Sequence, residues 1–368
     1  MTEILTHTAP FATAATAMRE PFLFLYITEK CPLRCLHCYM GERLDRERRM
    51  TPDYVEQVLE ALRITYGQYK VYLLGGEPTT HPQFDAILDV CKRQGYQVVL
   101  TTNGLIPART WPALDDRIDS FSFSMDGATA ETHEAMRGDN TWRHLISSMK
   151  RAIDAGFQTR AIFTVTTANQ RDVFAAIDFA DRMGLEMLSF HYFTPTGRGR
   201  DKPEYQLAPR DWMQLCGRIR DASADMRLRV FYPPAFAPAG QLPALRQAGY
   251  GGCTARSLER LAVFPDGRVY ICSAFFDTDL HYGQIIDGQV VPRTIPDGVT
   301  ELTLVNRVSA NCRGCPHGSL CGGGCAAYDH LDKTLRSSDC DRHIVPVCPL
   351  WSMPVEPATT EHRLIDLR

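Results

Sequence analysis

Between residues 22 and 192 the chain alternates short runs rich in β-branched and aromatic residues with longer amphipathic segments. The expected strands are FLFLYI (22–27), KVYLLG (70–75), QVVLTT (97–102), DSFSFSM (119–125), TRAIFTV (159–165) and EMLSFHY (186–192). Helical patterns lie between them, several ending at a glycine that can adopt the left-handed conformation. Consecutive strand-then-helix units require parallel pairing with right-handed crossovers. The sequence therefore predicts an α/β fold, either a (β/α) barrel or a doubly wound sheet.

Unusual loops follow the first four predicted strands. CPLRCLHCYM (31–40) follows the first strand, GGEP (75–78) closes the second, TNG (102–104) follows the third and SMDG (124–127) closes the fourth. Because the carboxyl ends of parallel strands share one edge of a sheet, we expect these loops to form a single ligand site. After the sixth strand, TPTGRG (194–199) is either another contributor to that site or a simple crossover loop.

The distribution of the 13 cysteines favours metal binding over disulfides. The chain is neither small nor visibly secreted, so a disulfide framework is not expected. Cys31, Cys35 and Cys38 form one cluster directly behind the first strand. A zinc ion there would need His37 or a distant residue as its fourth ligand, whereas a cubane would keep one iron open. Two isolated cysteines are expected to pack as small hydrophobic residues in helices: Cys91 and Cys216.

The spacing Cys31-x3-Cys35-x2-Cys38 behind a first strand resembles the hallmark of radical S-adenosylmethionine (SAM) enzymes. Most members have an aromatic residue before the last cysteine; here His37 stands there and Tyr39 follows, a variant also common in the family. The resemblance implies a partial (β/α)6 TIM-like barrel and a 4Fe-4S cluster on the three cysteines, with SAM chelated at the fourth iron. Reductive cleavage of SAM then gives a 5′-deoxyadenosyl radical, which abstracts hydrogen from a substrate.

A second motif carries the same resemblance, since Gly75, Gly76, Glu77 and Pro78 match the Gly-Gly-Glu-Pro motif of the family. Glycines let the backbone approach a ligand, and a carboxylate can accept hydrogen bonds from the ammonium group of SAM. Three further cofactor-binding residues are expected on neighbouring loops, for the ribose or carboxylate of SAM: Asn103, Ser124 and Arg137. The alternative is that Asn-Gly and Asp-Gly are simple turns. The catalytic acid or base remains unassigned.

The last third of the chain resembles the SPASM extension of this family, a small domain with auxiliary 4Fe-4S clusters and a β-hairpin, here turning at Asp266 and Gly267. The resemblance assigns the first auxiliary cluster to Cys253, Cys272 and Cys325, and the second to Cys312, Cys315, Cys321 and Cys348. Glu259 stands where full members often have another ligand. The first auxiliary cluster therefore has an open iron, a non-cysteine ligand or Cys340, and a structural zinc site in this region is the alternative.

We expect four regions: an N-terminal extension (1–20), a radical SAM core (21–225), a linker rich in proline and glycine (226–252) and a SPASM domain (253–368). Apolar residues make up 44% and charged residues 23%, as in ordinary globular proteins. The formal charge of −3 gives no reason to expect nucleic acid or an anionic membrane as a partner. Without an evident export signal or membrane span, the protein is expected to be cytoplasmic.

Most SPASM enzymes modify ribosomally made peptides or protein side chains, so the resemblance implies an oxidoreductase of this kind. It also implies an electron donor such as flavodoxin or ferredoxin. Because only about twenty residues precede the first strand, a peptide substrate would need a separate recognition protein or direct docking. Ser273, where the sulfatase-maturating branch usually has aspartate, argues against that branch. The alternatives are an enzyme of small-molecule natural-product or cofactor biosynthesis and a non-catalytic zinc-binding scaffold.

Overall fold

The computed structural model describes residues 21–233, 246–247, 252–276, 278–293, 301–306, 325 and 327. Within these residues an 11-stranded sheet has the order β11-β10-β9-β8-β1-β2-β3-β4-β5-β6-β7. The strands are β1 (Phe22–Thr28), β2 (Lys70–Gly75), β3 (Val98–Thr102), β4 (Ser120–Ser124), β5 (Gln158–Val165), β6 (Met187–Tyr192), β7 (Arg229–Phe231), β8 (Arg260–Val263), β9 (Arg268–Tyr270), β10 (Gly283–Ile286) and β11 (Gln289–Pro292). The pairs from β8 through β1 to β7 are parallel, whereas β8 to β11 pair antiparallel.

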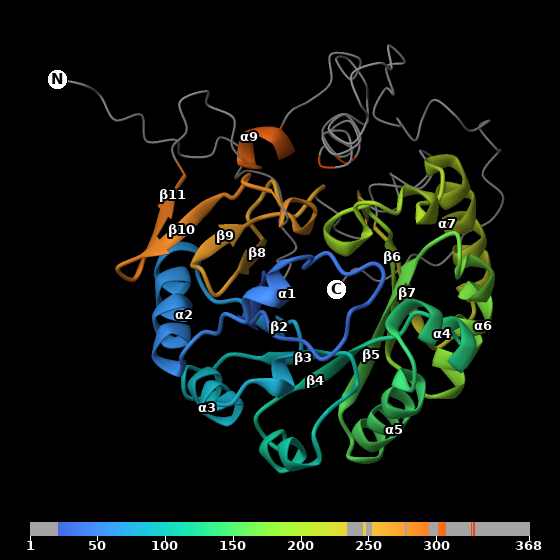
Figure 1. Ribbon diagram of the computed structural model, residues 1–368, viewed down its shortest axis with the longest axis horizontal. Helices are drawn as coiled ribbons and strands as arrows, with labels where there is room; N and C mark the ends of the chain where they lie inside the picture. Colours follow the sequence, from blue (N-terminus) through green and yellow to red (C-terminus); the bar gives the residue numbers. More distant parts are fainter. Residues whose placement is uncertain are drawn as a thin grey trace.

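Helices cover the outer face of the parallel strands, which curve around a central space (Figure 1). The helices are α1 (Arg43–Arg46), α2 (Pro52–Tyr66), α3 (Phe84–Arg93), α4 (Ala130–Arg137), α5 (Thr141–Asp154), α6 (Val173–Arg182), α7 (Pro209–Ser223) and α9 (Glu301–Val305). Thr51 caps α2, because its hydroxyl accepts a hydrogen bond from the Tyr54 amide at 3.2 Å. Five of the described helices are followed within two residues by a glycine with positive φ: Gly67, Gly95, Gly138, Gly156 and Gly184.

The strand alternation places apolar residues toward the helices. Leu23, Leu25 and Ile27 of β1 are at most 1% exposed, while Phe22 and Phe24 on the opposite face are half-buried and line the inner side of the curved sheet. The predicted α/β fold with a partial barrel is thereby confirmed.

Cys91 and Cys216 are buried in α3 and α7, as their helical patterns predicted.

Two strands extend the barrel beyond the six that the sequence predicted. β7 lies within the range expected as a linker and pairs with β6. β8 pairs parallel with β1 and then turns at Asp266 and Gly267 into β9, so the expected hairpin joins the barrel sheet itself. A second hairpin, β10–β11, continues this edge. In the described part of the chain, no helix is both long and apolar enough to traverse a bilayer.

Candidate functional site at the carboxyl ends of the strands

The three clustered cysteines lie in the loop that follows β1, close enough for the charge of one thiolate to raise the pKa of another. Burial, together with the charges of Glu77 and the neighbouring cysteines, raises the pKa of the Cys31 thiol to about 12. Burial and the charge of Cys35 raise the pKa of Cys38 to about 11. Thiolates so placed need a cation for stability, which fits an iron–sulfur cluster.

The donor groups around the clustered thiols fit a cubane. Nowhere in the described residues do three or more His, Cys, Asp or Glu side chains converge on one ion position. A cubane does not require such convergence, because each thiolate binds a different iron. N–H groups also point at the sulfurs: the Leu33 amide lies 3.4 Å from the Sγ of Cys31, and Nδ2 of Asn103 lies 3.7 Å from the same sulfur. This environment suits the metal-bound thiolate form.

Gly75 and Gly76 let the end of β2 pack directly on the cysteine loop. A Cβ atom on Gly75 would lie 2.3 Å from the carbonyl oxygen of Thr28, and one on Gly76 would lie 2.3 Å from that of Lys30. The Gly76 and Glu77 amides donate to these same two carbonyls at 2.8 Å. The structure shows that these glycines approach the loop that carries the cysteines, and the expected close approach to a ligand stays a prediction.

The Glu77 carboxylate is fully buried and accepts hydrogen bonds from the chain itself. Its Oε1 accepts from the hydroxyls of Thr79 at 2.7 Å and Thr102 at 2.9 Å, and its Oε2 accepts from the Asn103 amide at 2.8 Å. Pro78 begins the short 3-10 helix η1 (Pro78–Thr80), whose N-terminus Glu77 also caps. Glu77 therefore holds the loop that presents Asn103 to Cys31, and its expected bond to SAM stays a prediction.

Asp126, within the SMDG motif, organises the other side of the site. Its carboxylate is completely buried and lies 2.5 Å from Nε of Arg137 and 3.2 Å from Nε2 of His37, while Oδ1 accepts from the Thr164 amide at 2.7 Å. Burial alone would raise the pKa of Asp126, but the charges of Arg137 and His37 hold it well below its usual range. The sequence expectations had passed over this residue in favour of Ser124, which lies half-buried at the end of β4.

Arg137 makes two contacts in the structure, and its expected contact with the carboxylate of SAM stays a prediction. Its charge is paired with Asp126, and its Nη1 lies 3.8 Å from the Sγ of Cys35. The adjacent Met136 carbonyl accepts from the Leu36 amide at 2.9 Å. The carboxyl end of α4 is thus fixed against the cysteine loop. The signal available in the sequence was an arginine in the last turn of a helical pattern.

The TPTGRG segment also supports the cysteine loop. The Arg198 amide donates to the Cys38 carbonyl at 2.9 Å, and a Cβ atom on Gly197 would lie 2.4 Å from that carbonyl oxygen. Gly197 also has a φ of 56°, so both the close contact and the left-handed backbone conformation favour glycine there. The segment is therefore a brace for the cysteine loop, which neither of the two sequence interpretations had described.

A second group of cysteines flanks the β8–β9 hairpin: Cys253 precedes β8, while Cys272 and Cys325 follow β9, and the charges of Cys325 and Cys253 act on Cys272. Burial, and then those charges, raise the pKa of Cys272 well above its usual range. The buried Glu301 of α9 accepts hydrogen bonds from the Ile271 amide at 2.9 Å and the Cys272 amide at 2.7 Å, so it fixes the backbone there. The other cysteines assigned to auxiliary clusters lie outside the described residues: Cys312, Cys315, Cys321, Cys340 and Cys348.

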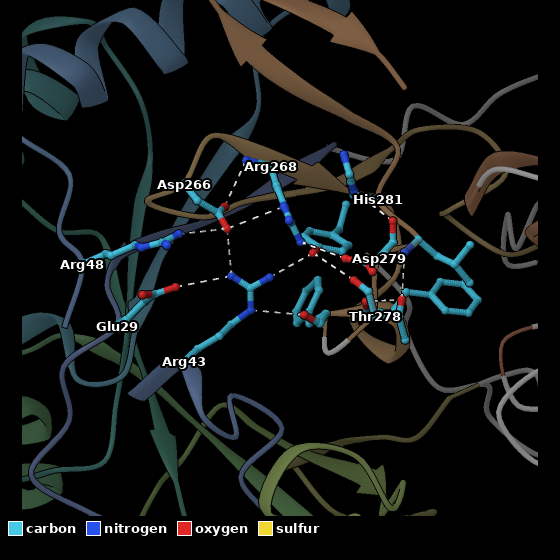
Figure 2. A network of polar contacts seen from close by, with 12 residues as sticks. Glu29, Arg43, Arg48, Asp266, Arg268, Thr278, Asp279 and His281 are labelled. Carbon is cyan, nitrogen blue, oxygen red and sulfur yellow. Dashed lines mark hydrogen bonds and ion pairs between the residues drawn. The ribbon is translucent and has the colours of Figure 1, made fainter. Parts of the chain in front are cut away.

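Arg43 of α1 joins the cysteine loop to the β8–β9 hairpin (Figure 2). Its Nη1 lies 3.3 Å from Glu29 and 3.2 Å from Asp266, and its Nη2 donates to the Tyr270 hydroxyl at 3.0 Å. Its guanidinium also lies 4.5 Å from the ring centre of Phe264. These contacts of Arg43 link the loop with Cys31, Cys35 and Cys38 to the hairpin that precedes Cys272.

Comparison with known proteins agrees with this geometry. The family model described as the Radical SAM superfamily matches residues 25–180. Mycofactocin maturase MftC of Mycobacterium ulcerans (strain Agy99) is 30% identical over 321 residues, which cover 82% of this chain and 81% of that protein. The chain belongs to the radical SAM superfamily. The predicted membership is confirmed, and as a radical SAM enzyme the protein is expected to use SAM and a 4Fe-4S cluster.

Solved structures share the fold, including its C-terminal hairpins. Streptococcus suis SuiB bound to precursor peptide SuiA matches with a TM-score of 0.67 at 19% identity, covering 84% of this chain and 73% of that one. The structure of native anSMEcpe with bound AdoMet and Cp18Cys peptide matches with a TM-score of 0.64 at 19% identity, covering 86% and 96%. The radical SAM architecture with a SPASM-type extension therefore extends through the described chain.

Proposed function

We propose that this radical SAM enzyme oxidatively modifies a ribosomally made peptide or a protein side chain. The observation that carries the proposal is the similarity to mycofactocin maturase MftC, which extends over 82% of this chain. SuiB, which shares the fold, has been solved with a bound precursor peptide. An electron donor of the flavodoxin or ferredoxin type and a separate peptide-recognition protein are part of the proposal.

Cys31, Cys35 and Cys38 would hold the 4Fe-4S cluster. Asn103 in the loop after β3, Ser124 at the end of β4 and Arg137 at the end of α4 remain the proposed SAM-binding residues, and two of them, Asn103 and Arg137, contact cysteine sulfurs. When bound, the cluster and SAM together supply a 5′-deoxyadenosyl radical for hydrogen abstraction. The residues of the chain position this chemistry: Glu77 holds the Asn103 loop, and Asp126 holds Arg137 beside Cys35. Cys253, Cys272 and Cys325 would bind a first auxiliary cluster.

Anaerobic reconstitution tests the cofactor part of this proposal. Three cubanes give roughly twelve irons per chain, one cubane roughly four. Cys35→Ala should abolish reductive formation of 5′-deoxyadenosine, because it removes one of three ligands. Cys91→Ala is the matched control, since Cys91 is buried in α3 away from the loop and its loss should leave SAM cleavage intact. Zinc without iron in the purified wild-type protein would contradict an enzyme of this class.

The substrate class is tested by deuterium transfer. Candidate peptides, encoded near the gene for this protein, and candidate metabolites are supplied in deuterated form, and deuterium is scored in 5′-deoxyadenosine. We expect labelling from a peptide. Labelling from metabolites alone would reject the peptide proposal and favour small-molecule biosynthesis.

A further inference from the structure

The inner face of the barrel carries an arginine that the proposed function has not used. β8 pairs with β1 so that Arg260 lies opposite Phe22, and it therefore shares the inner face with Phe22, Phe24 and Tyr26. The Cζ atom of Arg260 lies 4.7 Å from the centre of the Phe24 ring. Its guanidinium thus rests on an aromatic wall inside the barrel.

Arg260 lacks an anionic partner in the described part of the chain. Its side chain makes no hydrogen bond or ion pair with the described residues, and its buried Nε has no acceptor. Two other arginines on the same inner face differ, because Arg160 and Arg229 both pair with Glu186. Arg260 is therefore a half-buried cation that forms no ion pair among the described residues, although its charge acts on Glu301 and on the Cys272 thiol.

The described groups within electrostatic range of Arg260 include no carboxylate that forms an ion pair with it. His191 of β6 is accessible to solvent, yet the protein crowded around it and the charge of Arg260 lower its pKa to about 4. The hydroxyls of Tyr26 and Tyr39, which lie 2.8 Å apart, are also within electrostatic range. Two acidic groups lie within electrostatic range of Arg260: Glu301, whose carboxylate already accepts hydrogen bonds from two backbone amides, and the thiol of Cys272, which is an expected cluster ligand.

We propose that Arg260 binds a carboxylate of the substrate inside the barrel. The inference rests on the proposed function, and it narrows the substrate to one with an acidic side chain or a free C-terminal carboxylate near the reacting position. A guanidinium forms paired, charge-assisted hydrogen bonds with a carboxylate, and these are stronger in a recess than in bulk water. The aromatic wall of Phe24 and Tyr72 supplies apolar contact beside it.

A pair of small probes tests this site on the reconstituted enzyme with SAM bound. Calorimetry compares 3-phenylpropionate with 3-phenylpropionamide, which have the same ring and nearly the same shape but differ in charge. We expect the wild-type enzyme to bind the acid at least about tenfold more tightly. Arg260→Gln should remove this preference, and Arg260→Lys should retain part of it. Arg160→Gln, which changes a paired arginine of the same face, should keep the preference.

Equal binding of the two probes by the wild-type enzyme would overturn the proposal, as would a preference that survives in Arg260→Gln. Once a peptide substrate is found, two altered forms separate the sources of the carboxylate: one with its acidic residues replaced by amides, and one with an amidated C-terminus. The outcomes remain distinguishable. If only metabolites transfer deuterium and the wild-type enzyme still prefers the acid probe, the peptide proposal alone is rejected. If a peptide transfers deuterium but the transfer does not change with Arg260→Gln or with either altered peptide, the Arg260 proposal alone is rejected.

Discussion

At the scale of single residues, the site depends on buried charges that compensate one another. Asp126 is surrounded by Arg137, His37 and the Thr164 amide, and none of its oxygen atoms is exposed to water. A buried ion pair contributes little net stability compared with apolar packing, but removing one partner leaves the other charge uncompensated. The Asp126–Arg137 pair therefore matters most for keeping Arg137 beside Cys35.

Replacing Asp126 by Asn should lower the free energy of unfolding by about 3–5 kcal/mol, because Arg137 would keep its charge without a counter-ion. Urea denaturation monitored by circular dichroism measures the change. Glu47→Gln is the matched control: Glu47 pairs with Lys30 at 3.2 Å, but both side chains are about half exposed, so the loss should be below about 1 kcal/mol. Similar values for the two variants would contradict the importance of the buried pair.

His81 gives a prediction for pH dependence. It is 5% exposed, and burial lowers its pKa from 6.5 to about 4. Below about pH 6.5 the unfolded chain takes up a proton that the folded chain does not, so the free energy of unfolding falls as the pH drops toward 4. His81→Asn keeps an acceptor for the Gln83 amide and should flatten this fall between about pH 7.5 and 5.5. If the free energy of unfolding of the variant depends on pH as steeply as that of the wild type, His81 is not the group responsible. His144→Asn, at an exposed histidine, controls for the loss of one histidine.

At the scale of elements, the cysteine loop is held mainly by its neighbours. The end of β2, the end of α4 and the TPTGRG segment each contribute a backbone hydrogen bond to it. Glycine is required where the contact is closest, at the end of β2 and in the TPTGRG segment. The loop conformation is therefore a property of several elements that are distant in sequence.

Gly76→Ala should displace the cysteine loop, because the added methyl group would lie 2.3 Å from the Lys30 carbonyl oxygen and 2.7 Å from the Cβ of Cys31. We expect a reduced iron content after reconstitution and weaker absorbance of the cluster, both measurable without substrate. Gly217→Ala on α7 is the control: nothing lies within 4 Å of the added atom, and alanine favours a helix by about 1 kcal/mol. Full iron loading of the Gly76 variant would show that the loop adapts.

At the scale of the whole molecule, the barrel and the β8–β9 hairpin form one structural unit. β8 hydrogen-bonds to β1, Arg43 links the cysteine loop to Asp266, and an aromatic cluster fills the junction. Within this cluster Phe264 stacks on Tyr26 with ring centres 4.1 Å apart and lies 4.9 Å from Phe276. Such continuous packing predicts cooperative unfolding of both parts.

Phe264→Ala should lower the free energy of unfolding by about 3–5 kcal/mol, since it creates a cavity at this junction. The transition should stay single when it is monitored by both fluorescence and circular dichroism. Ile64→Ala, at a side chain that is 77% exposed, should change stability by no more than about 0.5 kcal/mol. Two separate transitions, with the barrel unaffected in the Phe264 variant, would show that the hairpin unfolds independently.

The sequence by itself determined the alternation of strands and helices, the helix ends and the common edge at which the motif loops meet, because these depend on local periodicity and on the rules of parallel pairing. The close spacing of Cys31, Cys35 and Cys38 was equally visible. Only the tertiary structure decided what Asp126 and Arg260 face and that Glu77 binds its own chain. The physical reason is that charge compensation and close approach arise between residues far apart in sequence, and no local pattern records which partner lies across the barrel.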